Sequence, residues 1–108
     1  MRLDNRSILR KILRCHAKVA MAGRPPLNAR TVDISPNGMC LLVAEQLPAG
    51  LSCNVSFEVP LNGKMKKVQV IAKAVYSVFG TDGFRIGMQF TQVDPASAAV
   101  IDEIWASG

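Results

Sequence analysis

Histidine, aromatic residues and long apolar runs are scarce in this chain of 108 residues. It contains one histidine, and its three cysteines, Cys15, Cys40 and Cys53, show no CxxC spacing. A zinc site needs several such ligands close together, so no metal centre is expected. No apolar run approaches the roughly 20 residues that span a bilayer, so we expect no membrane insertion.

The inventory of reactive groups argues against an enzyme. His16 has no evident serine or cysteine partner, and the acids Asp33 and Glu58 carry no acid–base signature. No glycine-rich phosphate loop precedes a helix. We therefore expect a binding module. Basic residues interrupt the apolar part of the first 14 residues, so a secretory signal is not expected, and the predicted location is the cytoplasm, as a separate protein or a module of a larger chain.

Apolar residues and positive charge are abundant. Hydrophobic residues make up 49% of the chain, which supports one globular domain, and the formal net charge is +5. This charge favours an anionic partner, which could be nucleic acid, a nucleotide or a membrane surface, and does not choose among them. The cysteines are odd in number and sit in apolar patterns, which is typical of buried thiols in a reducing compartment.

Alternation of apolar and polar residues indicates a strand-rich fold. Asn62-Gly63 predicts a type I′ hairpin turn, while Asp94-Pro95 predicts the start of a helix with Asp94 as its N-cap. The predicted strands cover residues 15–21, 28–34, 39–44, 51–59, 66–78 and 84–91. The sequence thus predicts a mainly β fold: a six-stranded antiparallel barrel with a C-terminal helix, spanning residues 15–108.

Residues 1–14 form a basic N-terminal segment with two open interpretations. On a helical wheel, apolar residues gather on one side and arginines on another. The arginines are Arg6, Arg10 and Arg14, and the apolar residues are Ile8, Leu9, Ile12 and Leu13. The segment is either a basic amphipathic helix or a mobile arm that wraps a ligand.

A short polar turn, Asp33-Ile-Ser35-Pro-Asn-Gly38, separates the second and third predicted strands. Aspartate can accept two parallel hydrogen bonds from guanine N1–H and its amino group, and serine can donate or accept beside it. Gly38 permits either a positive φ or a close backbone approach. Arginine adds a planar fork for guanine O6 and N7 or for phosphate oxygens. Together these groups suit a guanine nucleotide.

Two motifs resemble a known family. Arg6-Ser-Ile-Leu-Arg10 matches an RxxxR element, and the turn from Asp33 to Gly38 matches a D/NxSxxG element. Both are typical of PilZ domains, receptors for the bacterial second messenger cyclic di-GMP. The similarity extends from about Arg6 to Phe90, because residues 84–90 resemble the closing strand of these domains.

The resemblance implies a ligand and roles for the motif residues. In PilZ domains the two arginines hold phosphates and guanine edges, the second motif binds a guanine, and two ligand molecules often stack as an intercalated dimer. Arg6 and Arg10 would take the first role, and Asp33, Ser35 and Gly38 the second. No separate cofactor is implied.

The frame of the first motif has an alternative, because Arg10-Lys-Ile-Leu-Arg14 also fits RxxxR. We prefer Arg6 and Arg10, since the family usually leaves several residues before the first strand. Arg14 would then flank the site and add a stacking or phosphate contact. Ligand binding is predicted to order residues 1–14, and a partner protein or fused domain would respond. The apolar residues of this segment also suit packing against a second subunit, which would give a homodimer.

Two other functions stay open: a PilZ-like interaction scaffold that binds no nucleotide, and a small basic barrel that binds single-stranded nucleic acid. The latter mode uses aromatic platforms, whereas aromatics here are 6% and three phenylalanines fall on inward positions, so no nucleic acid is expected. Gly87 is either a bend that lets the barrel close or a gap for a base. Motility, pilus function, exopolysaccharide synthesis and virulence are all open as the downstream process.

Overall fold

The structure, a computed structural model, describes residues 11–106. Antiparallel strands dominate, and one helix follows them, which confirms the predicted mainly β fold with a C-terminal helix. The elements are β1 (Lys11–Ile12), β2 (His16–Met21), β3 (Arg24–Ser35), β4 (Gly38–Val43), β5 (Ser52–Leu61), β6 (Lys64–Gly80), β7 (Gly83–Val93) and α2 (Pro95–Ala106).

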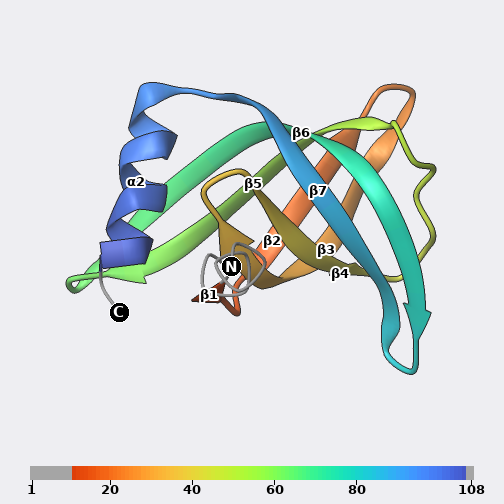
Figure 1. Cartoon of the computed structure of the whole chain (residues 1–108), viewed down its shortest axis with the longest axis horizontal. Helices are drawn as coiled ribbons and strands as arrows, with labels where there is room; N and C mark the ends of the chain where they lie inside the picture. Colours follow the sequence, from red (N-terminus) through yellow and green to blue (C-terminus); the bar gives the residue numbers. More distant parts are fainter. Residues whose placement is uncertain (1–10, 107–108) are drawn as a thin grey trace, which may run out of the picture.

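Six of the strands, β2 to β7, form a ring (Figure 1). They follow the order β3, β2, β5, β6, β7, β4, and a further pairing of β3 with β4 closes the circle. Strand β1 pairs only with β3 and is a seventh strand that the sequence did not predict. Its two residues are too few to show a period of two.

The interior of the ring is filled by the inward residues of each strand. In β5, Cys53, Val55, Phe57 and Val59 are buried and alternate with exposed or half-buried polar residues, as the sequence predicted. The turn after β5 also follows its prediction: Asn62 has φ 51° and Gly63 has φ 78°, the positive values that a type I′ turn requires.

Helix α2 covers one side of the ring and packs on β6 (Figure 1). Val100, Ile101 and Ile104 are buried in the core. The Oδ1 atom of Asp94 accepts a hydrogen bond from the Ser97 amide at 3.2 Å, so Asp94 caps the helix as predicted. Within residues 11–106, no helix is long and apolar enough to cross a membrane.

Strand β3 starts earlier than its pattern predicted. The pattern predicted a strand from residue 28, yet β3 begins at Arg24 and includes Pro25 and Pro26. They fall where the pairing of β2 with β3 shifts register, between Val19 and Met21. A bulge leaves backbone groups outside the regular ladder, so the missing N–H groups of proline are tolerated there.

The buried side chain of Thr31 attaches the segment before β2 to β3. Its Oγ1 atom accepts a hydrogen bond from the Cys15 amide at 2.7 Å and donates one to the Leu13 carbonyl at 2.6 Å. Lys11 Nζ reaches further, donating to the carbonyl oxygens of Ile104 at 3.0 Å and Trp105 at 3.2 Å. The last four residues of the predicted arm are thus held against the ring, while residues 1–10 lie outside the described part of the chain.

Candidate functional site

The polar turn joins β3 to β4 at the edge of the ring. Asp33 and Ser35 are half-buried and alternate with the fully buried Ile34. The ladder of β3 and β4 shifts register between Thr31 and Asp33, and such a bulge changes the direction of the side chains beside it. The Phe90 amide donates to the carbonyl of Asn37, within the turn, at 2.9 Å and ties it to β7.

Hydrogen bonding and close packing hold the residues of the turn in place. Ser35 Oγ donates to the Gly38 carbonyl at 3.2 Å, which leaves its lone pairs as acceptors. Gly38 is buried and does not have a positive φ. A Cβ on Gly38 would collide with the carbonyl oxygen of Met88 in β7. Of the two roles expected for this glycine, the structure therefore selects the close backbone approach.

Asp33, Ser35 and Gly38 line one shallow depression of about 200 Å³ on the outer face of β3, β4, β7 and β6. The structure thus brings together all three predicted site residues of the second motif. The remaining lining residues are Asn37, Met39, Val75, Tyr76, Gly87, Met88 and Gln89.

Tyr76 was not predicted from the sequence, yet its ring lies in this depression. It pairs in register with Gly87, and a Cβ on Gly87 would collide with the ring. Gly87 therefore makes room for an aromatic side chain, a role that neither sequence interpretation included. A register shift between Ala74 and Tyr76 breaks the period of two in β6, so alternation alone could not have placed this tyrosine on the outer face.

The arginines are distributed differently. Arg6 and Arg10 lie outside the described residues. Arg14 is exposed and lines two neighbouring grooves, but it does not line the depression with Asp33. The contact predicted for it stays a prediction.

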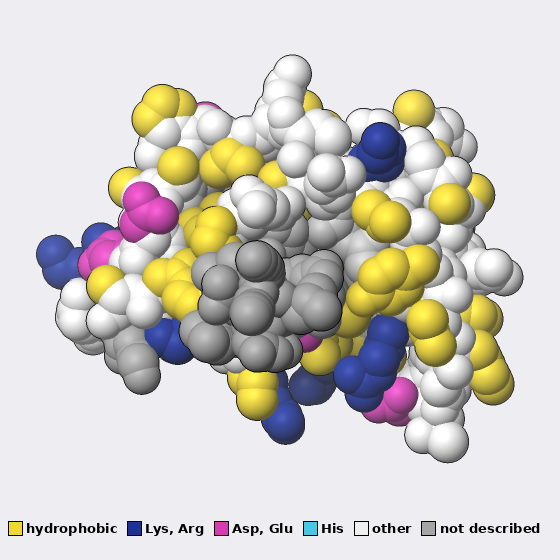
Figure 2. Space-filling model, in the orientation of Figure 1, with side chains coloured by type: hydrophobic (Ala, Val, Ile, Leu, Met, Phe, Trp, Pro, Cys, Tyr) yellow, Lys and Arg dark blue, Asp and Glu magenta, His cyan; other side chains and the backbone are white. Residues whose placement is uncertain are grey.

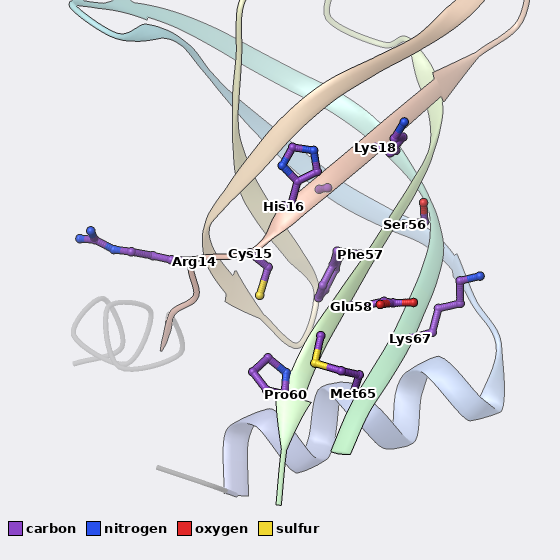
Figure 3. A pocket seen from close by; sticks show the side chains of 11 residues that line it. Arg14, Cys15, His16, Lys18, Ser56, Phe57, Glu58, Pro60, Met65 and Lys67 are labelled. Carbon is purple, nitrogen blue, oxygen red and sulfur yellow. The ribbon is translucent and has the colours of Figure 1, made fainter. Parts of the chain in front are cut away.

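One of these grooves, of about 570 Å³, runs over β2, β5 and the start of β6. Figure 3 shows Arg14 at one end of the groove and Glu58 and Lys67 at the other, with the Arg14 side chain pointing away from them. Glu58 and Lys67 are partners in the β5–β6 ladder, so opposite charges lie next to each other here. Within residues 11–106, no group of three or more His, Cys, Asp or Glu side chains is placed to hold a metal ion.

Of the three cysteines, Cys40 and Cys53 are buried and Cys15 is half-buried. Burial raises the pKa of the Cys53 thiol. Burial likewise raises the pKa of the Cys15 thiol, and the hydrogen bond with Thr31 opposes this shift in part. Protonated thiols are weak nucleophiles, so Cys15 and Cys53 are suited to packing.

These features define a ring of six antiparallel strands with a flanking C-terminal helix and a polar depression beside its β3–β4 turn. A family model described as PilZ domain matches residues 4–106. The chain belongs to the PilZ domain family. A search of curated proteins gives no match.

Three solved structures share this fold at low sequence identity. The inhibitor of motility MotI/DgrA of Bacillus subtilis matches with a TM-score of 0.78 and 9% identity, over 92% of this chain and 48% of MotI/DgrA. The PilZ domain of CeSA from a cellulose-synthesizing bacterium gives 0.62 and 16%, over 92% and 98% of the two chains. The PilZ domain of Escherichia coli YcgR with c-di-GMP gives 0.60 and 19%, over 87% and 80%. The chain thus spans about half the length of MotI/DgrA, and these likenesses concern the fold.

Proposed function

We propose that this PilZ domain binds cyclic di-GMP in the depression beside the β3–β4 turn. The observation that carries the proposal is the meeting of Asp33, Ser35 and Gly38 in one depression next to the ring of Tyr76. The Asp33 carboxylate would accept hydrogen bonds from the guanine N1–H and amino group, and Ser35 would accept or donate beside it. Tyr76 is 41% exposed and would offer a face on which a base can stack.

The phosphates would be held by the RxxxR arginines. Lys11 pairs with Ile34, the residue between Asp33 and Ser35. Arg10 directly precedes Lys11 in the sequence, so the RxxxR motif ends next to the strand that pairs beside the turn. This supports the frame with Arg6 and Arg10, because Arg14 lines other grooves. Arg14 would make a smaller contribution.

The output would be a change of surface. Arginines that repel one another in the free protein would be neutralised by a ligand with two negative phosphates, which orders the N-terminal residues over the site. An effector protein or a fused domain in the cytoplasm would respond to this change of surface. We propose motility or exopolysaccharide synthesis as the process, since proteins of the same fold include an inhibitor of motility and a PilZ domain from a cellulose-synthesizing bacterium.

Titration calorimetry with cyclic di-GMP tests the proposal. Asp33→Ala and Arg10→Ala each remove charge-assisted hydrogen bonds worth about 1.5–3 kcal/mol, so affinity should fall about 10- to 150-fold. Asp102→Ala, which removes an exposed carboxylate on α2, is the matched control and should bind like the wild type. Thermal melts should show that all three variants are folded.

Two results would change the proposal. Wild-type protein that takes up no cyclic di-GMP at millimolar concentration would favour the interaction scaffold. A larger loss from Arg14→Ala than from Arg10→Ala would move the RxxxR frame by four residues.

A further inference from the structure

A row of four side chains crosses the outer face of β3, β4, β7 and β6. The strand register pairs Arg30 with Leu42, Leu42 with Arg85, and Arg85 with Val78. Residues paired in register point to the same face of a sheet, so a cation and an apolar side chain alternate along this arginine–apolar row. Arg30, Arg85 and Val78 are exposed, and Leu42 is half-buried.

Three of these residues line a groove of about 520 Å³. Ile12, Arg14 and Asp82 also line it. Arginines outnumber carboxylates here by three to one, so the groove is cationic. A concave cationic surface attracts anionic partners more strongly than an isolated surface charge does.

The guanidinium groups of this groove have no partner within the described part of the chain. Within residues 11–106, Arg14, Arg30 and Arg85 make no side-chain hydrogen bond or ion pair. Arg24 provides the contrast, since its guanidinium donates to both carboxylate oxygens of Glu45 at 2.8 and 2.7 Å. The three groove arginines therefore keep their donors for a carboxylate from outside the chain.

Exposed apolar side chains accompany these cations. Val78 is 54% exposed at the end of the row, and Ile12 is 73% exposed at the edge of the groove. Figure 2 shows apolar side chains over the β6–β7 hairpin at the lower right, with basic and acidic side chains beside them. Exposed apolar side chains rimmed by polar ones are typical of interaction sites.

The spacing along the row indicates which shape of partner fits. Neighbouring strands lie about 4.8 Å apart, so the row members stand at about 0, 5, 10 and 14 Å. A helix rises 1.5 Å per residue, so its positions 1, 4, 8 and 11 lie at about 0, 4.5, 10.5 and 15 Å on one face. An extended peptide repeats its face about every 6.8 Å and does not match.

We propose that the arginine–apolar row docks an acidic amphipathic helix of a partner protein. The helix would present carboxylates at positions i and i+7 to Arg30 and Arg85, and apolar side chains at i+3 and i+10 to Leu42 and Val78. An anionic bilayer fits less well, because the groove is concave and the carboxylate of Asp82 lines it. This inference does not depend on the binding of cyclic di-GMP.

Fluorescence anisotropy with a labelled helical peptide of 14 residues tests the proposal. The acidic probe carries Glu at positions 1 and 8 and Leu at 4 and 11, and the control probe carries Lys in place of both Glu residues. Wild-type protein should bind the acidic probe at least tenfold more tightly than the control, and 0.5 M salt should weaken that binding.

Charge reversal identifies the surface. Arg30→Glu and Arg85→Glu should each weaken binding of the acidic probe at least tenfold. Lys18→Glu, an equal change of charge at an exposed residue outside the groove, should have little effect. The Arg30→Glu/Arg85→Glu double variant should prefer the Lys probe, a swap of specificity that a merely unfolded variant cannot show.

Other results would overturn the proposal. They are equal binding of both probes, indifference to the two reversals, or a wild type that binds only phosphatidylserine vesicles, which would assign the row to a membrane. Asp33→Ala separates this proposal from the nucleotide proposal, since it should bind the acidic probe like the wild type even though its affinity for cyclic di-GMP falls.

Discussion

The β5–β6 ladder and the ladders around the β3–β4 turn differ in the regularity of their strand pairing. Strands β5 and β6 pair without a register shift from Ser52 opposite Lys73 to Leu61 opposite Lys64. The ladders around the turn shift between Thr31 and Asp33 and between Ala74 and Tyr76. Both shifts adjoin the depression, so the candidate site lies on the irregular wall, while both walls contribute inward residues to the core.

The difference has a steric origin. In β5 each residue needs only the correct polarity for its face, and many residues satisfy that condition. On the other wall, Gly38 touches the Met88 backbone and Gly87 receives the Tyr76 ring, so each site requires one residue type. The site should therefore be more sensitive to added atoms than the regular wall is.

Gly38→Ala should give the largest effect. Its Cβ would collide with a backbone carbonyl, and the turn cannot move away easily because Asn37 is bonded to the Phe90 amide. Overpacking of this kind costs up to about 3 kcal/mol of unfolding free energy, and affinity for cyclic di-GMP should fall with it. Urea denaturation measures the loss. Gly80→Ala is the control, because its Cβ would meet only ordinary contacts at 3.5 and 3.6 Å. Equal stability of the two variants would refute the close approach at Gly38.

Thr31→Val should come next. Valine keeps the shape of threonine but leaves the Cys15 amide and the Leu13 carbonyl without the Thr31 hydroxyl. Losing such a buried partner costs about 2 kcal/mol. Thr91→Val is the control, since it removes an exposed hydroxyl bonded to the Ile71 carbonyl. If both variants melt at the same temperature, the hydroxyl of Thr31 does not anchor residues 13–15.

Gly87→Ala should have the smallest effect, about 1 kcal/mol, because the obstacle is a partly exposed ring that can rotate rather than backbone. A double-mutant cycle with Tyr76→Ala sharpens the test. In the Tyr76→Ala background the added methyl group should cost almost nothing, and that coupling would show that Gly87 exists to receive the ring. If the losses of unfolding free energy are additive, the interpretation of Gly87 as a bend that closes the barrel is favoured instead.

Local patterns predicted much of the fold and the three residues of the second motif that meet in the depression. The alternation of β5, the Asn62-Gly63 turn and the Asp94 cap depend on neighbouring residues, so the sequence displays them directly. The second motif was found because its residues lie within one turn. Tyr76 was missed because a residue 43 positions after Asp33 reaches the depression only through ladder register, which no local pattern encodes.

The contact of Lys11 with α2 links the two ends of the described chain. Helix α2 has no basic residue in its last turn, and Lys11 Nζ supplies that charge from β1, 6.0 Å from the centre of the Trp105 ring. Lifting β1 from the ring would thus remove a counter-charge from the helix terminus and loosen its final turn. Release of β1 would therefore be measurable as faster amide hydrogen exchange in the last turn of α2.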